Sequence, residues 1–333
     1  MQDYSTDNIA DAAMMSNDPL LGSPERLVPP DKPKLTPEDV KEKTSGNYLF
    51  SFGFPGSGKT TFQWMMMNYL MNEGPFHPKI QVPDRANGPD WEGRGIINSW
   101  KNQWIEGRFP DSTPAGERNV REVMVHAHTT AGKKLAVDFS FLEASGELMH
   151  TVIPGYPEAG KSPELTPLLR AYLENPRLKF VVLLMLSPDI EENDQLFPSF
   201  VSYLDQNFRG LRDRMSLGVI VTKPRESLRR LRKFGASDGS KDFPEFDEKT
   251  LEAYVNRFCG ETYQIWESWP YPKKTLLSSL YIGEIEMIEG EQRLVKPDFH
   301  HIGEIFFWVF EQFTGKRPGP TPWQRFTGRL DWK

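Results

Sequence analysis

The sequence contains a single cysteine, Cys259, among its 333 residues. One cysteine excludes a disulfide within the chain, and its place in an apolar, helix-like stretch predicts a buried and unreactive thiol. Such sparing use of cysteine is typical of proteins from reducing compartments, so we expect a cytoplasmic protein.

Long hydrophobic runs are also absent, because no apolar run approaches the roughly 18 to 20 residues that a helix needs to cross a bilayer. The N-terminus lacks the charged-then-apolar pattern of a signal peptide, and neither end carries a lipidation motif. We therefore expect no membrane span. The formal net charge of -6 provides no general attraction for polyanions, so we expect no nucleic-acid partner.

The composition is sufficient for a folded core, with 38% hydrophobic and 12% aromatic residues. Residues 1–46 are rich in Asp, Ser, Pro and Asn without periodicity, which predicts a disordered N-terminal arm. Residues 316–333 combine aromatic and basic side chains after several prolines, and we predict a flexible tail. Its aromatic residues would either dock on a protein partner or pack back onto the domain; they are Trp323, Phe326 and Trp332.

Residues 53–60 read GFPGSGKT and fit the pattern G-x-x-x-x-G-K-[ST] without a mismatch. The apolar run Asn47–Phe52 precedes them and has the length of a strand. Lys59–Met71 follows without Gly or Pro for about three helical turns. A strand, a glycine-rich turn and a helix in this order predict a P-loop, and the alternative is a similar turn that binds no ligand.

In a P-loop the glycines allow successive backbone N–H groups to point at a phosphate chain that lies against the helix N-terminus. Lys59 would reach the terminal phosphates, the Thr60 hydroxyl would bind Mg²⁺, and the Thr61 N–H would support the α-phosphate. The predicted phosphate-binding residues are Gly53, Phe54, Pro55, Gly56, Ser57, Gly58, Lys59, Thr60 and Thr61.

Strand-like and helix-like segments alternate along the rest of the chain, which predicts an α/β P-loop NTPase sandwich with a mostly parallel sheet. Arg121–Thr129 and Lys134–Leu142 interrupt this alternation, because both are strand-like and only a short turn separates them. They predict one antiparallel hairpin. The further expected elements are strands at Leu178–Ser187, Leu217–Thr222 and Thr275–Ile282, and helices at Pro198–Met215 and Glu304–Phe313.

Taken together, residues 47–315 resemble the Ras-like GTPases of the translation-factor-related class. The resemblance depends on the P-loop, the hairpin, and three short motifs at the ends of later strands, all in the family's order. It implies a Ras-like nucleotide-binding domain that binds GTP or GDP with Mg²⁺ and signals to a protein partner. Residues 74–120 would then be an enlarged switch insertion, reminiscent of bacterial GTPases of the double-GTPase type.

In this family the second hairpin strand ends in D-x-x-G, whose acidic residue holds Mg²⁺ through a water and whose glycine senses the γ-phosphate. Glu143 and Gly146 stand at these positions here. Glu147 occupies the place of the glutamine that orients the attacking water. A carboxylate there would repel the γ-phosphate, so we expect a weak GTPase with slow hydrolysis.

Base recognition in the family uses [NT]-K-x-D, and Thr222 and Lys223 match its first two positions. The aspartate is missing, and Glu226, one residue later, is the candidate replacement. Discrimination of guanine from adenine therefore stays open, and ATP is not excluded. The family's base-contacting S-A-K loop is resembled by Ser278, Ser279 and Leu280.

A threonine of the switch region closes on Mg²⁺ when Ras-like proteins bind GTP. Thr113 is the best placed candidate for this role, Ser112 is the second, and an ordinary turn threonine is the alternative. Arg108 is either an arginine finger supplied within the chain or a solvent-facing loop residue.

Three functions remain open. The first is a regulatory GTPase switch, and the second is a nucleotide-locked assembly module that does not turn over. The third is a P-loop kinase for a small metabolite, supported only by Arg229, Arg230 and Arg232. The basic run Arg225–Lys233 is otherwise expected to be a solvated helix face, because acidic residues follow it.

Overall fold

The computed structural model describes residues 35–74, 76–81, 84–85, 88–89, 92–111, 120–129, 135–143, 152–153, 165–233, 248–270 and 275–317. All of them belong to one compact unit, Leu35–Lys333.

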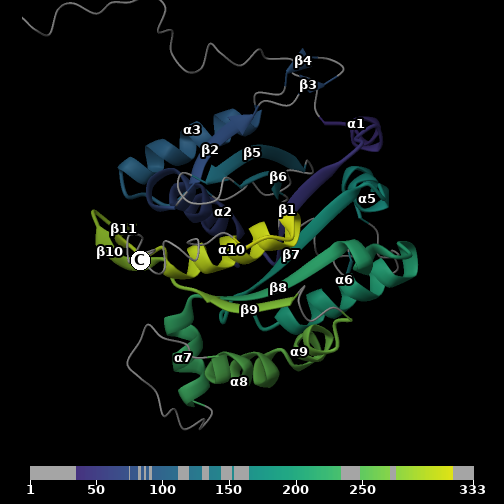
Figure 1. Cartoon of the computed structure of the whole chain (residues 1–333). Helices are drawn as coiled ribbons and strands as arrows, with labels where there is room; N and C mark the ends of the chain where they lie inside the picture. Colours follow the sequence, from purple (N-terminus) through teal and green to yellow (C-terminus); the bar gives the residue numbers. More distant parts are fainter. Residues whose placement is uncertain are drawn as a thin grey trace, which may run out of the picture. The chain divides into compact units, whose positions relative to one another are not determined.

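A seven-stranded sheet organises this unit, with the strand order β2-β5-β6-β1-β7-β8-β9 (Figure 1). The strands from β6 to β9 in this order are parallel, whereas β5 is antiparallel to β6 and β2 is antiparallel to β5. The predicted parallel sheet with an antiparallel hairpin is therefore confirmed, and β2 is an additional edge strand. The bounds are β1 Gly46–Phe52, β2 Phe76–Gln81, β5 Arg121–Thr129, β6 Ala136–Glu143, β7 Leu178–Leu186, β8 Met215–Thr222 and β9 Thr275–Leu280.

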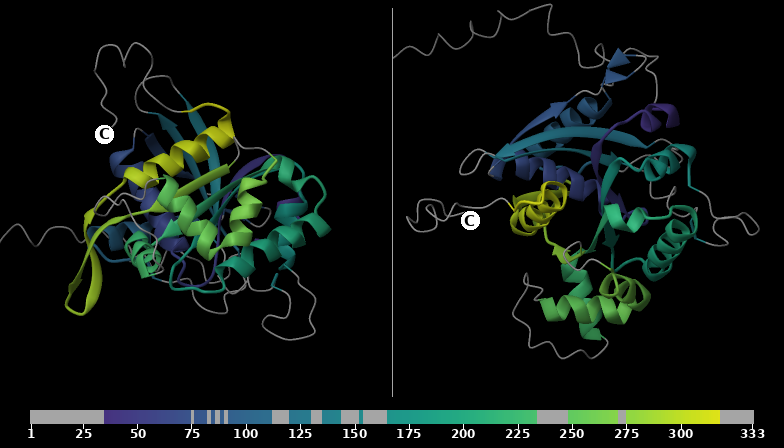
Figure 2. Two further views of the ribbon diagram at one scale, coloured as in Figure 1. Left: turned by 90° about the horizontal axis from the view of Figure 1, so that it is seen from below. Right: turned by 45° about the vertical axis from the view of Figure 1, so that its right-hand side comes forward.

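The central strands are almost continuously apolar because helices cover both faces of the sheet (Figure 2). One core lies under α2, α3 and α10, and the other lies under α1, α5, α6 and α8. Gly218 in β8 makes room in this packing, since a Cβ there would lie 2.5 Å from Leu183 Cδ2. The bounds are α1 Pro37–Lys41, α2 Lys59–Asn68, α3 Glu92–Ile105, α5 Pro167–Glu174, α6 Asn193–Asn207, α7 Pro224–Lys233, α8 Glu248–Phe258, α9 Gly260–Glu267 and α10 His300–Thr314.

Both ends of the helix predicted at Pro198–Met215, and the start of the helix predicted at Glu304–Phe313, were wrong. α6 ends at Asn207, and Met215 belongs to β8. α6 begins at Asn193 and contains Pro198, because the buried Phe197 and Phe200 hold its apolar face on the sheet. Proline removes one helical hydrogen bond, but packing of this kind overrides that local cost. α10 begins four residues earlier than predicted, where Asp298 Oδ1 accepts a hydrogen bond from the His300 N–H at 2.8 Å.

A second hairpin, β10 (Gly283–Ile288) and β11 (Glu291–Pro297), was not predicted. It begins directly after the strand expected at 275–282, which stops two residues early, at Leu280. Glu289 and Gly290 form its two-residue turn with φ of 55° and 84°, as in turns that match the twist of a hairpin. The remaining short elements are β3 Asp84–Arg85, β4 Gly88–Pro89, the π-helix η3 Tyr69–Glu73 and the 3-10 helix η4 Leu211–Arg214.

The structure places residues 35–45, expected in the N-terminal arm, within the domain instead. Thr36 and Asp39 form a capping box at the start of α1, and Val40 is fully buried against the domain. Residues 1–34 and the aromatic residues Trp323, Phe326 and Trp332 lie outside the described residues.

Cys259 is buried, as predicted, at the junction of α8 and α9. Burial raises the pKa of its thiol to about 12, so the reactive thiolate is scarce at neutral pH. No helix among the described residues has both the length and the apolar character needed to cross a membrane.

Candidate functional site

The loop between β1 and α2 has the conformation that its glycines permit. Gly56 and Gly58 have φ of 75° and 92°, in the left-handed region that other residues rarely adopt. Gly53 is needed for a different reason, since a Cβ there would lie 2.6 Å from Ser57 Oγ and 2.9 Å from the Met185 carbonyl oxygen. The chain therefore turns tightly and exposes the N-terminus of α2.

Lys59 begins α2 and folds back over this loop. Its Nζ donates to the carbonyl oxygens of Gly53 and Phe54, each at 2.8 Å. An ammonium group and a helix N-terminus in the same place favour a negatively charged ligand. Ser57 lies beneath the loop instead, with a fully buried hydroxyl that has no hydrogen-bond partner among the described residues.

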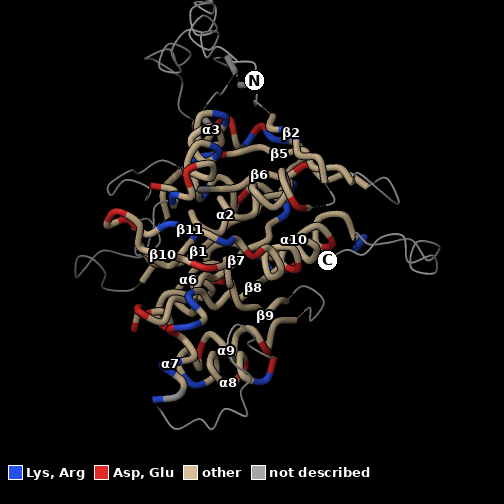
Figure 3. The backbone as a smooth tube through the Cα atoms, turned by 90° about the vertical axis from the view of Figure 1, so that its left-hand side faces the viewer, with Lys and Arg blue, Asp and Glu red and all other residues tan. Residues whose placement is uncertain are grey.

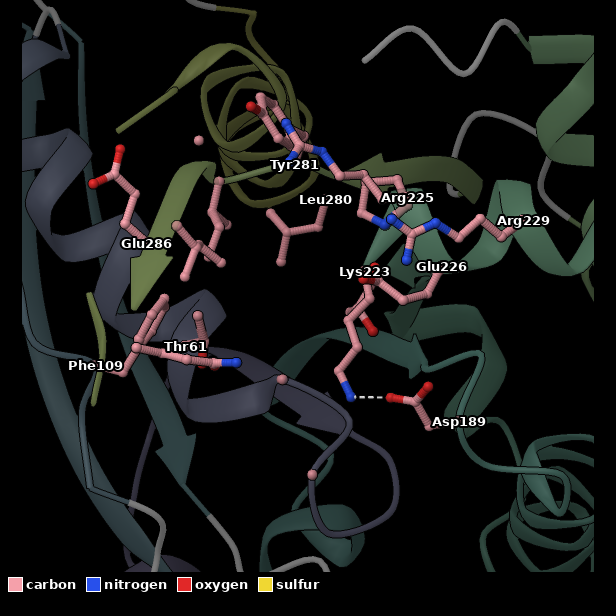
Figure 4. A pocket seen from close by; sticks show the side chains of 18 of the residues that line it. Thr61, Phe109, Asp189, Lys223, Arg225, Glu226, Arg229, Leu280, Tyr281 and Glu286 are labelled. Carbon is pink, nitrogen blue, oxygen red and sulfur yellow. Dashed lines mark hydrogen bonds and ion pairs between the residues drawn. The ribbon is translucent and has the colours of Figure 1, made fainter. Parts of the chain in front are cut away.

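A cavity of about 630 Å³ begins at the loop and extends along the carboxyl edge of the sheet (Figure 4). Its volume lies within the range of roughly 300 to 1,000 Å³ that is usual for small-molecule sites. Segments that are far apart in the sequence surround it: the P-loop, Phe109, Asp189 after β7, the start of α7, and the chain from the end of β9 into the β10–β11 hairpin. The residues that line the cavity are Gly56, Gly58, Thr61, Phe109, Asp189, Thr222, Lys223, Pro224, Arg225, Glu226, Arg229, Leu280, Tyr281, Ile282, Gly283, Ile285, Glu286, Met287 and Gln292.

Lys223 stands at the end of β8 with a φ of 48°, which costs about 1 to 2 kcal/mol for a residue with a side chain. The surrounding bonds hold this conformation: Glu226 N–H donates to the Lys223 carbonyl at 3.0 Å, and Thr222 Oγ1 donates to the Leu186 carbonyl at 3.0 Å. A strained residue that lines a cavity points to a functional position.

The Lys223 ammonium forms an ion pair with Asp189, which follows β7 (Figure 4). Sequence analysis missed Asp189, although the carboxyl ends of adjacent parallel strands must meet at one edge. Both side chains are about half exposed, at 41% and 57%, so the pair contributes little stability. Its effect is to orient the lysine stem along the cavity.

Helix α7 contributes further charged side chains, of both signs, to this end of the cavity. Glu226 adds a second carboxylate, and Arg225 and Arg229 add guanidinium groups. The basic helix is therefore only partly a solvated face, because Arg230 also donates to the Pro188 carbonyl at 2.9 Å and lies 4.5 Å from the Phe258 ring centroid. Figure 3 shows basic and acidic positions interspersed along the described chain.

Strand β9 includes the residues that were predicted to form a base-contacting loop. Ser278 and Ser279 belong to this strand, in register with Ile220 and Val221 of β8, and neither lines the cavity. Leu280 does line it, and the connection that follows is Tyr281–Gly283. The assignment of Ser278 and Ser279 to a cavity loop is therefore corrected, because the strand continues through both residues.

His301, in α10, holds this connection in place with a hydrogen bond. Its Nδ1 accepts a hydrogen bond from the Tyr281 N–H at 3.0 Å, which requires an unprotonated Nδ1. Burial lowers the pKa of His301, so the neutral ring that can accept this bond is favoured at neutral pH. No local pattern in the sequence indicates this role of His301.

Replacing His301 with alanine is expected to loosen Tyr281–Gly283 and to weaken nucleotide binding by about 2- to 10-fold, which corresponds to one hydrogen bond of about 0.5 to 1.5 kcal/mol. Titration with a fluorescent nucleotide analogue measures this. His300→Ala is the matched control, because His300 is adjacent in the sequence and its ring lies 5.6 Å from that of His301, but its side chain is 73% exposed and pairs with Glu304 at 3.6 Å. Equal affinities of the two variants would contradict the role of His301.

At the other end of the cavity, β6 pairs in parallel with β1, and Leu142 is in register with Phe50. The backbone of Glu143 thus reaches the same edge of the sheet as the P-loop. The Glu143 side chain and the residues Ser112, Thr113, Gly146 and Glu147 lie outside the described part of the structure. Arg108 is directed to acidic partners instead of the cavity, with Glu106 at 3.3 Å and Glu291 at 3.5 Å.

Within the described residues, no cluster of three or more His, Cys, Asp or Glu side chains is arranged to hold a metal ion. Mg²⁺ does not need one, because it commonly uses one or two protein ligands together with phosphate oxygens and waters. Thr60, the residue predicted for this role, lies at the start of α2 beside the loop.

No protein-family model matches the sequence, and no curated protein matches it at a significant level. Among solved structures, the chain is similar to a chain from the "Signal recognition particle receptor SRb-GTP/SRX complex from Chaetomium thermophilum". The sequence identity is 13% and the TM-score is 0.39, and the match covers 81% of this chain and 99% of that chain. A TM-score this low supports no statement about function.

Proposed function

We propose that this protein is a Mg²⁺-dependent GTP-binding regulatory switch with slow GTP hydrolysis, which signals to a protein partner. One observation carries the proposal: a single cavity of about 630 Å³ joins a P-loop at Gly56 and Gly58 to the strained Lys223. A nucleoside triphosphate needs both ends, one for its phosphates and one for its base.

At the phosphate end, Lys59 would exchange its two carbonyl acceptors for phosphate oxygens. The backbone N–H groups of the loop and of Thr61 would hold the remaining oxygens. Mg²⁺, held by the Thr60 hydroxyl, would supply neutralising charge when bound. These groups favour in-line attack by water, because they stabilise the charge that develops on the γ-phosphate.

At the base end, the Lys223 stem would lie over the base, and a carboxylate would accept hydrogen bonds from guanine. Glu226 and Asp189 are the carboxylates that line this end. Asp189 is engaged by Lys223, which leaves Glu226 as the preferred acceptor. An adenine base presents an acceptor where guanine presents an N–H, so a carboxylate there selects GTP over ATP.

The switch itself remains a proposal based on the family resemblance. Thr113 and Glu143 would complete the Mg²⁺ site, Gly146 would sense the γ-phosphate, and Glu147 would make hydrolysis slow. The switch region and the aromatic tail with Trp323, Phe326 and Trp332 would contact the partner. We further propose a cytoplasmic location, which is supported by the single buried cysteine.

The test is titration of the purified protein with fluorescent GTP, GDP and ATP analogues and Mg²⁺, followed by phosphate release over several hours. We expect guanine-selective binding with slow turnover, and a loss of this selectivity in Glu226→Ala. Glu261→Ala is the control, because Glu261 is an exposed acidic residue of α9 that does not line the cavity. Adenine-selective binding would refute the GTPase assignment, and binding without turnover would indicate the nucleotide-locked assembly module.

A further inference from the structure

The β10–β11 hairpin lies outside the seven-stranded sheet, between its last strand and α10 (Figures 1 and 2). It nevertheless forms part of the cavity wall, through Ile285, Glu286, Met287 and Gln292. The fold does not need the hairpin to complete the sheet, so its contribution to the cavity calls for a separate explanation.

The hairpin exposes apolar side chains to an unusual degree. Among the described residues, the exposed large hydrophobic side chains are Ile105, Ile285, Met287 and Val295, and three of these four belong to the hairpin. Ile285 and Met287 are 43% and 65% exposed, and their spacing of two residues places them on the same face of β10. Both residues line the cavity, so their exposed surface is available to a ligand.

The hairpin is anchored on its other strand. The Leu294 N–H donates to the Gly107 carbonyl at 2.8 Å, Arg293 forms a β-bridge with Arg108, and Leu294 is buried. Phe109, next along the chain, also lines the cavity, and its ring centroid lies 5.7 Å from that of Trp64. The apolar face of β10 is thus held beside Phe109 by contacts that leave Ile285 and Met287 free to meet a ligand.

Most of the charged residues that line the cavity lie on the facing wall, and Glu286 is the exception. Figure 4 shows Phe109 and Glu286 on one side of the cavity, and Lys223, Glu226 and Asp189 on the other. Phosphates belong at Gly56 and Gly58, where the backbone donors are. An apolar wall provides no partner for phosphate, but it suits the flat base and the carbon atoms of ribose.

We propose that the β10–β11 hairpin is a nucleotide-binding element, in which Ile285 and Met287 pack with Phe109 against the base and ribose, opposite Lys223. This inference rests on the proposed function and adds to it a wall that the P-loop and base motifs do not provide. Because Leu294 is bonded to Gly107, nucleotide held on this wall also restrains the segment Gly107–Asp111, which leads toward Thr113.

The test compares the double variant Ile285→Ser/Met287→Ser with Val295→Ser. Val295 is equally part of the hairpin and 40% exposed, but it does not line the cavity. We expect the double variant to bind fluorescent GTP about 10-fold more weakly or worse, because burial of two apolar side chains is lost. Val295→Ser should bind as the unmodified protein does. Affinity for inorganic tripolyphosphate should stay the same in all three proteins, because it has no base or ribose.

The outcomes separate this inference from the proposed function. If the unmodified protein binds no nucleotide, both fail. If it binds nucleotide and the double variant binds equally tightly, the hairpin inference fails alone, and it also fails if tripolyphosphate binding weakens in parallel.

Hydrogen exchange on the unmodified protein gives a second readout that needs no variant. Nucleotide is expected to slow amide exchange several-fold at Gly283–Ile288 and at Leu294, whose N–H bonds to Gly107. Unchanged exchange at these amides, under conditions in which nucleotide is bound, would overturn the inference.

Discussion

Replacing Lys59 with alanine is expected to weaken binding of nucleoside triphosphates by about 10- to 100-fold. The variant loses a charge-assisted hydrogen bond to phosphate, which contributes roughly 1.5 to 3 kcal/mol. Equilibrium titration with fluorescent GTP and Mg²⁺ measures this loss, and thermal unfolding checks that the variant is folded. Lys101→Ala is the matched control, because Lys101 is an exposed lysine on α3 outside the cavity.

Full nucleotide affinity in the Lys59→Ala variant would remove the basis for every function considered above. Each of them requires a P-loop lysine at the phosphates. A variant with reduced affinity for tripolyphosphate as well as GTP would instead locate the loss at the phosphate end, in contrast to the hairpin variants.

Replacing Glu122 with alanine is expected to lower the free energy of unfolding by about 3 to 5 kcal/mol. The Glu122 carboxylate is fully buried and accepts hydrogen bonds from Lys43 Nζ at 3.1 and 3.2 Å, from Ser140 at 2.8 Å and from Tyr172 at 2.9 Å. Removing it leaves an ammonium group and two hydroxyls without their acceptor in a region that is largely closed to water. Urea unfolding followed by tryptophan fluorescence measures the change.

Glu284→Ala is the control for this prediction. Glu284 pairs with Lys296 at 3.2 Å, but the two side chains are 51% and 75% exposed, and such surface pairs contribute about 0 to 1 kcal/mol. Tyr172→Phe should fall between the two variants, because it removes only one of the hydrogen bonds. A Glu122→Ala variant as stable as Glu284→Ala would show that the buried network does not hold the residues around Lys43 on the domain.

The structure also bears on the kinase alternative. A kinase lid needs arginines that can swing onto a phosphoryl group, yet Arg230 is bonded to the Pro188 carbonyl and packed on Phe258. The Arg232 side chain lies outside the described residues, which leaves Arg229 as the described arginine of that set at the cavity. This arrangement suits binding of a nucleotide better than a mobile lid.

Sequence reasoning was most accurate where the signal is local. The glycines at 53, 56 and 58 predict a tight turn because only glycine tolerates its conformation and close approach. Apolar runs of strand length predicted β1, β5, β6, β7 and β8, and the most continuous runs belong to β7 and β8, which are buried along almost their whole length. It was less accurate at boundaries such as Pro198 in α6, where packing outweighed a local preference.

The sequence by itself determined the P-loop, the mostly parallel sheet and the order of the elements, because each depends on residues that are near one another in the chain. Only the tertiary structure decided which groups face the cavity. The pairing of Asp189 with Lys223, the bond from Tyr281 to His301, and the attachment of Leu294 to Gly107 join residues 20 to 187 positions apart in the sequence. Such contacts leave no local pattern, since they arise only when the sheet brings distant strand ends together.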